Sequence, residues 1–236
     1  MRTGRVSALF AAAAIASLAV VGVAGPASAK SHKSNKKDHS STTATSSPSS
    51  QLSALGNEVS AAKNRTFKAT WTTSGSSGPS TVTLEQRPPQ SLFTAGGGSG
   101  GGEVLATGKT TYFCSGASSG PKTCISAAGA NPLASLVGLY TGSAFLSTVQ
   151  GFAAEAEAKA AGVSLKFSSQ SFSGLPARCV SVSAKGQSFK WCVTDSGILA
   201  YASQGGKTTF QLTSYSTKVS PSDFNLPAGA TVQSIP

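Results

Sequence analysis

Few residues of this sequence have side chains that could perform catalysis or bind a metal. After residue 50 the chain contains no histidine, because both histidines, His32 and His39, come before it. A Ser-His-Asp triad, a Cys-His dyad and an ordinary zinc site are therefore excluded from that part of the chain. Glu155 and Glu157 lie two residues apart on a predicted helix, so their side chains diverge. A carboxylate pair assembled by the fold would have to come from these residues: Glu58, Glu85, Glu103, Glu155, Glu157, Asp195 and Asp223.

Two segments approach known catalytic motifs without matching them. Residues 102–110 resemble a phosphate-binding loop, but the spacing before Gly108-Lys109-Thr110 is one residue too long and predicted strands flank it. Ser119 and Lys122 have the S-x-x-K spacing of penicillin-binding enzymes, yet they lie in a predicted turn and not at the start of a helix. We therefore predict no catalytic residue, no cofactor and no metal site, and hence a protein that is not an enzyme.

The chain contains four cysteines, and the predicted strand register selects one of their possible pairings. A hairpin folded about Lys185-Gly186 places Cys179 opposite Cys192 on one face. Opposed residues at a non-hydrogen-bonded site lie about 4.5 Å apart at Cα, which is close enough for a disulfide. By elimination, Cys114 pairs with Cys124. The other face of the hairpin then carries two opposed apolar pairs, Val180 with Trp191 and Val182 with Phe189.

A second hairpin is predicted directly after the first, with Gly205-Gly206 as its two-residue turn. In the register that this turn implies, Tyr201 faces Phe210 and Leu199 faces Leu212. All four side chains then share one face of the sheet. We expect that face to continue the apolar face of the preceding hairpin.

The N-terminal residues have the organisation of a secretory signal peptide. Arg2 and Arg5 give a positive start, residues 8–23 are mainly apolar, and Ala27-Ser28-Ala29 is an A-x-A cleavage signal. The apolar stretch is short for a membrane-spanning helix, which needs about 20 residues. We expect cleavage after Ala29 and a secreted, extracytoplasmic protein of the cell envelope, where disulfides persist. No cysteine lies near the cleavage site, so a lipoprotein anchor is not expected.

The chain is predicted to consist of three parts: the signal peptide (1–29), a disordered Lys/Ser/Thr spacer (30–50) and one domain (51–236). The spacer has almost no apolar side chains with which to repay the entropy of ordering. The domain holds 13 basic and 7 acidic residues, and the basic residues are scattered over many segments. Nucleic acid is therefore not an expected partner, because it would require a clustered basic stripe. A mildly basic surface favours contact with the cell envelope surface.

Hydrophobic periodicity predicts short strands interrupted by helices. A first helix is expected over 52–63, with Ser50 as its N-cap. A second helical region is expected to start at Asn131-Pro132 and to continue in a longer helix that ends at Gly162. Alternating apolar and polar residues predict strands at 66–73, 81–85, 92–94, 104–107 and 110–114.

The order of these elements resembles the LolA/RseB/LppX-LprG group of bacterial envelope proteins, as does the closing sequence Asp223 to Ala230. The resemblance covers about residues 52–232. It implies an α+β, mostly β fold: a single strongly curved antiparallel sheet, a half-barrel of about ten strands, with helices covering the open side. The chain departs from the group in two respects. It lacks the lipobox cysteine of the LppX-LprG branch, and the arginine-centred core of the carrier branch has no identifiable counterpart.

The resemblance implies carriage of a lipid or an acylated protein in an apolar cavity between sheet and helices, and we expect the protein to be a monomer. The alternative is a partner-binding or cell-wall-associated sensor module without bound lipid, in which the same side chains form an ordinary packed core. The expected cavity-lining residues are Phe67, Trp71, Val82, Leu84, Phe145, Val149, Phe152, Val180, Val182, Phe189, Trp191, Leu199, Tyr201, Phe210 and Leu212.

Overall fold

The computed structural model describes residues 47–75, 78–96, 101–116, 120–128, 133–157, 162–184 and 186–234. The predicted signal peptide, most of the predicted spacer, Ser119, Asn131-Pro132 and Lys185 lie outside these ranges. Within the described ranges, no helix combines the length and apolar character needed to cross a bilayer.

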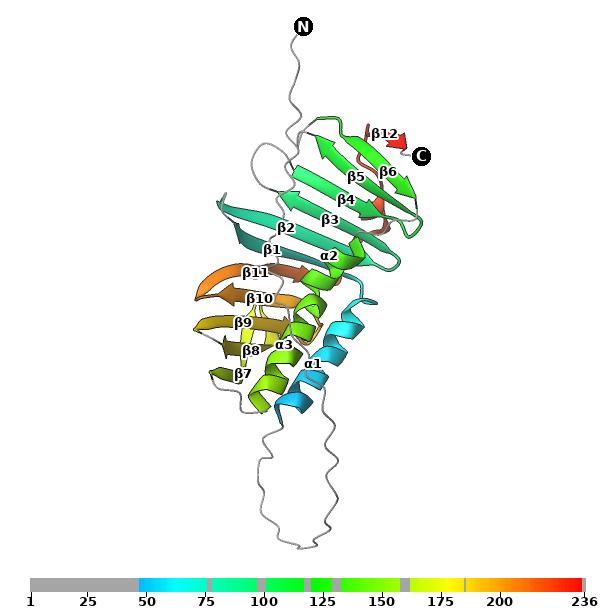
Figure 1. Ribbon diagram of the computed structural model, residues 1–236. Coiled ribbons are helices and arrows are strands. Elements are labelled where there is room, and N and C mark those ends of the chain that lie inside the picture. The colour runs from blue at the N-terminus through cyan, green and yellow to red at the C-terminus, as the bar shows by residue number, and fades with distance from the viewer. Residues whose placement is uncertain are drawn as a thin grey trace, which may run out of the picture. The chain divides into compact units, whose positions relative to one another are not determined.

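The strands of the described residues form one open, curved sheet (Figure 1). Its strand order is β12-β6-β5-β4-β3-β2-β1-β11-β10-β9-β8-β7. The curved, mostly antiparallel sheet with helices that the sequence predicted is therefore confirmed, with twelve strands in place of about ten. The strands are β1 (Phe67–Gly75), β2 (Gly78–Arg87), β3 (Gln90–Gly96), β4 (Gly101–Ala106), β5 (Thr110–Gly116), β6 (Thr123–Ala128), β7 (Val163–Phe172), β8 (Leu175–Ala184), β9 (Gln187–Thr194), β10 (Leu199–Gln204), β11 (Lys207–Ser216) and β12 (Thr231–Ser234).

The parallel pair at one edge of the sheet was not predicted. After β11 the chain forms a 3₁₀ turn, η1 (Pro221–Phe224), and then β12 pairs with β6 in parallel. The other pairings are antiparallel. A four-residue strand such as β12 has too short an apolar pattern to be recognised in sequence, and all four of its residues are exposed.

The first helix, α1 (Pro48–Ala62), begins before the predicted residue. Ser47, not Ser50, is the N-cap, and its Oγ accepts a hydrogen bond from the Ser50 amide at 3.3 Å. Proline is well suited to the first helical position, because its missing N–H would have no partner there. The two later helices are α2 (Leu133–Tyr140) and α3 (Ser143–Glu157).

The three α-helices lie on the same face of the sheet (Figure 1). We call this the helix face and the other the back face. α1 contacts α3, and α3 contacts β7 and β8. Gly56 permits the close approach of α1 to α3, because a Cβ there would lie 3.2 Å from Cδ2 of Leu146. The end of α1 is held by the buried Gln86 of β2, whose amide donates to the carbonyls of Ala62, Lys63 and Arg65 at 2.8–3.0 Å.

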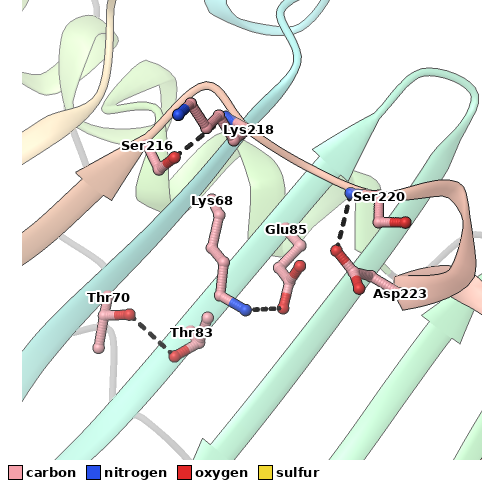
Figure 2. Close-up of polar contacts among 8 residues, drawn as sticks. All are labelled: Lys68, Thr70, Thr83, Glu85, Ser216, Lys218, Ser220 and Asp223. Carbon is pink, nitrogen blue, oxygen red and sulfur yellow. Dashed lines mark hydrogen bonds and ion pairs between the residues drawn. The ribbon is translucent and has the colours of Figure 1, made fainter.

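The C-terminal segment covers part of the back face. Ser220 and Asp223 form a capping box at η1, with the Ser220 amide donating to Oδ2 of Asp223 at 2.9 Å (Figure 2). Phe224 is buried there against Leu92 and Leu105. Figure 2 also shows a row of polar pairs beside this segment, namely the 2.8 Å ion pair Lys68–Glu85 and the Thr70–Thr83 hydrogen bond. The back face is therefore polar over β1 and β2 and apolar beneath η1.

The predicted register of the β8–β9 hairpin is confirmed. Cys179 opposes Cys192 and the two are bridged, as are Cys114 and Cys124 across β5 and β6. The opposed apolar pairs Val180–Trp191 and Val182–Phe189 are also as predicted.

The predicted register of the β10–β11 hairpin is wrong beyond its first two pairs. Next to the turn, Gln204 opposes Lys207 and Ser203 opposes Thr208, as predicted. A β-bulge then leaves Thr209 unpaired, so Ala202 opposes Phe210 and Tyr201 opposes Gln211. The predicted pairs Tyr201–Phe210 and Leu199–Leu212 are therefore not formed. A single inserted residue moves the side chains beyond it to the other face.

Gly197, in the turn between β9 and β10, lies against the backbone of α1. Its φ of +78° lies in the left-handed region, and a Cβ at this position would lie 2.2 Å from the carbonyl oxygen of Glu58 and 2.8 Å from Cβ of Ala62. No other residue type fits this contact without moving the helix or the turn.

We expect Gly197→Ala to lower the free energy of unfolding by about 3 kcal/mol or more, because it adds a clash with a helix backbone to a left-handed φ. The matched control is Gly206→Ala, since Gly206 has a φ of +76° and open space around its missing Cβ. This control should cost only about 1–2 kcal/mol. Urea unfolding followed by circular dichroism measures both, and equal losses would contradict the close contact.

Candidate functional site

The predicted lining residues gather in two apolar clusters on the sheet. The first, which we call the α1/α3 cluster, lies beneath those two helices. It includes eight of the predicted residues: Phe145, Val149, Phe152, Val180, Val182, Phe189, Trp191 and Phe210. The second, the Tyr140 cluster, surrounds the last residue of α2. It includes Phe67, Trp71, Val82, Leu84, Leu212 and, at its border with the first, Phe210, and Tyr201 packs against it.

Aromatic rings connect the α1/α3 cluster from sheet to helix. The rings of Phe189 and Trp191 stack with centroids 5.7 Å apart, and Phe145 of α3 lies 5.9 Å from Trp191. Trp191 is buried, whereas Phe145, Phe152 and Phe189 are partly exposed. Partly exposed rings at a helix–sheet boundary give this layer an apolar margin that a ligand can reach.

The Tyr140 cluster is more completely enclosed. Its central ring, Tyr140, contacts Trp71 at 4.7 Å, Phe93 at 5.7 Å and Phe210 at 5.9 Å. The Trp71 side chain has 0% exposure, and its indole Nε1 donates to the carbonyl oxygen of Leu199 at 2.6 Å. Leu199, the remaining predicted lining residue, is likewise fully buried. A buried indole N–H with a backbone partner is typical of a well-packed core.

Tyr201 does not share the face on which it was predicted. It opposes Cys192, while Ala202 opposes Trp191, so Tyr201 lies on the back face with the disulfide. Its ring stacks on Phe172 at 5.4 Å. The Lys190 ammonium lies 5.9 Å from the centre of the Tyr201 ring. Tyr201 therefore belongs to a small aromatic group behind the sheet, away from Phe189 and Trp191.

A pocket of about 190 Å³ opens between the first half of α1 and the β7–β8 hairpin. Its apolar walls are Leu55, Phe167 and Val180, all of which belong to the α1/α3 cluster. The polar lining comes from Gln51, Ser168, Ser169 and Arg178. Arg178 also forms an ion pair with Glu58 of α1, in which its Nη2 donates to Oε1. The pocket is thus an opening into the apolar layer with a charged group at its rim.

A second apolar surface was missed in the sequence. Phe93, Val104, Phe113 and Ile125 oppose one another across β3 to β6, in line with the Tyr140 cluster. Phe113 and Ile125 are each 39% exposed. The signal was present in the alternation of these strands, but β6 was not recognised, so the row could not be assembled.

Among the residues that the structure describes, no three His, Cys, Asp or Glu side chains come together as a metal-binding group would require. Three of the described carboxylates instead pair with basic side chains: Glu58 with Arg178, Glu85 with Lys68 and Glu103 with Lys122. The chemistry of the described site is therefore that of apolar contact with a few polar groups at its margin.

No protein-family model and no curated protein matches this chain. Among solved structures, it is similar to MucB in the MucA/MucB complex of Pseudomonas aeruginosa, with 15% identity, a TM-score of 0.49, and coverage of 78% of this chain and 64% of that one. It is also similar to LprF from Mycobacterium bovis, with 15% identity, a TM-score of 0.40, and coverage of 79% and 100%. The chain spans 60–66% of the length of the MucB chains that it matches.

The curved sheet with helices on one face is the architecture that the resemblance to the LolA/RseB/LppX-LprG group implied. With every identity below 25% and every TM-score below 0.5, the matches say nothing about the ligands or partners of this chain.

Tyr140 on the helix face and Tyr201 on the back face should titrate differently. Burial raises the pKa of Tyr140 to about 12. The hydrogen bonds of Tyr201 with Thr208 and Ser203 lower the pKa of Tyr201, and the charge of Lys190 lowers it further. Burial raises this pKa, but by less. Absorbance titration of the phenolate should therefore resolve Tyr201 first and Tyr140 last.

In the unfolded chain Tyr140 loses its proton near pH 10, but in the folded protein it keeps that proton until about pH 12. This stabilisation is complete below pH 10 and is lost as the pH rises to 12. We expect unfolding free energy to fall by about 2–3 kcal/mol over this window from Tyr140 alone. Tyr140→Phe should remove that slope and Tyr201→Phe should keep it. An unchanged slope in Tyr140→Phe would contradict the buried position of the hydroxyl.

Proposed function

We propose that this protein is an exported binding protein that carries an acyl chain, of a lipid or of an acylated protein, between α1, α3 and the sheet. The observation that carries the proposal is the pocket walled by Leu55, Phe167 and Val180, which opens directly into the α1/α3 cluster. A binding site of this type is apolar, with a few polar groups at its edge.

The arrangement of the helices supports this proposal. The α1/α3 cluster lies between the helices and β7 to β11, and its contacts are mainly between apolar side chains, with the Arg178–Glu58 ion pair at the edge. The aromatic margin of Phe145, Phe152 and Phe189 remains partly exposed. An acyl chain can replace contacts between such side chains with equivalent apolar contacts, because apolar burial is not directional.

The size of the pocket sets a condition on binding. Its volume of about 190 Å³ is below the ~300–1,000 Å³ of sites that enclose a drug-sized ligand. A long acyl chain therefore requires the first half of α1 to move away from β7 and β8. The second half of α1 is held by the hydrogen bonds from Gln86 and by the contact with Gly197. Only the first half of the helix, beside the pocket, would therefore move away from the sheet.

The disulfides support a location outside the cytoplasm, since bridges between strands persist in an oxidising compartment. Cleavage after Ala29 is part of the proposal. The alternative, a module that binds a partner protein or the cell wall without lipid, makes a different prediction for the same protein. It predicts that the α1/α3 cluster excludes acyl chains under all conditions.

The two tryptophans, Trp71 and Trp191, provide the test. We expect brominated fatty acids to quench the fluorescence of Trp191, because its ring lies in the layer that the acyl chain would enter. Trp191→Phe should abolish the quenching, since Trp71 lies in the Tyr140 cluster. Ser169→Trp, which places a large ring at the rim of the pocket, should weaken uptake about tenfold in a competition assay.

The control is Ser164→Trp, an exposed substitution on the same strand that points to the back face. It should leave uptake unchanged. Native mass spectrometry of the protein purified from its own host gives an independent measurement, with a co-purifying lipid as the expected result. No quenching together with a ligand-free mass would contradict the carrier and favour the partner-binding module.

A further inference from the structure

Arg178 occupies a position that the apolar core does not explain. It lies on β8, two residues before the buried Val180, and points to the helix face where α1 passes over the hairpin. Its side chain is 41% exposed, although it is ion-paired with Glu58. A guanidinium group has several N–H donors in a planar fork, so one carboxylate oxygen leaves donors on its other edge. Those donors are at the rim of the pocket and in contact with water.

Of the described residues that line this pocket, Arg178 is the one with a charged side chain. The nearest cation along β7, Lys166, opposes Ser181 and therefore lies on the back face. Ser168, Ser169 and Gln51 complete the polar lining. Ser169 opposes Arg178 and shares its face, so the pocket has an apolar floor and one end at which the guanidinium and the Ser169 hydroxyl can act as donors.

The carboxylate of Glu58 binds the guanidinium of Arg178 through only one of its two oxygens. Its Oε1 accepts from Arg178, but its Oε2 is buried and has no hydrogen-bond partner among the described residues. Because Glu58 belongs to α1, the ion pair also ties that helix to β8. An anionic group that approached the rim would compete with Glu58 for the same fork.

Building on the proposed function, we infer that the site selects amphiphiles with an anionic head, a carboxylate or a phosphate, and that Arg178 binds this head. The acyl chain lies along Leu55, Phe167 and Val180, and the head accepts hydrogen bonds from the guanidinium. Arginine is the side chain best suited to bind carboxylate and phosphate groups, because its N–H donors form a planar fork. The head displaces Glu58, which releases α1 from β8 as the chain enters.

The test compares dodecanoate with dodecanol, two ligands with the same chain and different heads, by displacement of a fluorescent acyl probe below micelle concentrations. The wild-type protein should bind dodecanoate about fivefold more tightly than dodecanol, the ratio expected for a partly exposed ion pair. Arg178→Gln should abolish this preference, and Arg178→Lys should retain part of it. Glu58→Gln should strengthen dodecanoate binding more than dodecanol binding, because it removes the competing carboxylate as well as the link between α1 and β8.

Lys166→Gln is the matched control, since it removes one positive charge from the same hairpin on the opposite face. It should preserve the preference. If the wild-type protein binds both ligands equally, or if Lys166→Gln and Arg178→Gln have the same effect, the assignment of Arg178 is overturned while the carrier function stands. If neither ligand binds to the wild-type protein, the carrier function itself fails. Should Arg178→Gln not fold, Arg178→Lys and Glu58→Gln decide the question.

Discussion

The alternation of side chains across one continuous sheet determines most of this structure. The sheet places its large apolar side chains on the helix face, including Trp71, Val180 and Trp191, and that face must be covered. α1 and α3 cover it over β7 to β11, and α2 covers it beside β1 and β3. Where no helix of the described chain lies over it, as at Phe113 and Ile125, apolar side chains remain exposed. The distribution of helices over the sheet therefore decides where ligands can make apolar contacts.

Sequence reasoning succeeded where several local constraints acted on the same strands. In the β8–β9 hairpin, the cysteines, the apolar pairs and the turn all required one register. In the β10–β11 hairpin only the turn and the apolar pattern were available. The unpaired Thr209 shifted the register there, and it left Tyr201 on the back face. A bulge of one residue has no signature of its own in a strand rich in threonine and serine.

The sequence predicted the burial of side chains more reliably than it predicted whether they line a cavity or form a packed core. Phe67, Trp71 and Leu84 were expected to line a cavity, and each is enclosed by neighbouring side chains. Burial follows from strand alternation, whereas a space for a ligand depends on how far a helix stands from the sheet. Tyr140, which fills the space between α2 and three strands, was recognised as part of an apolar helix face but not as the centre of a cluster.

The hydrogen bonds from Gln86 to the carbonyls at the end of α1 have a mechanical consequence. They fix the C-terminal end of that helix to the second strand, and Gly197 holds the preceding turn from the other side. The N-terminal end is tied mainly by contacts around Leu55 and by one ion pair. Because α1 is fixed at Ala62, a small rotation of the helix about that residue produces its largest displacement at the opposite end, near Pro48.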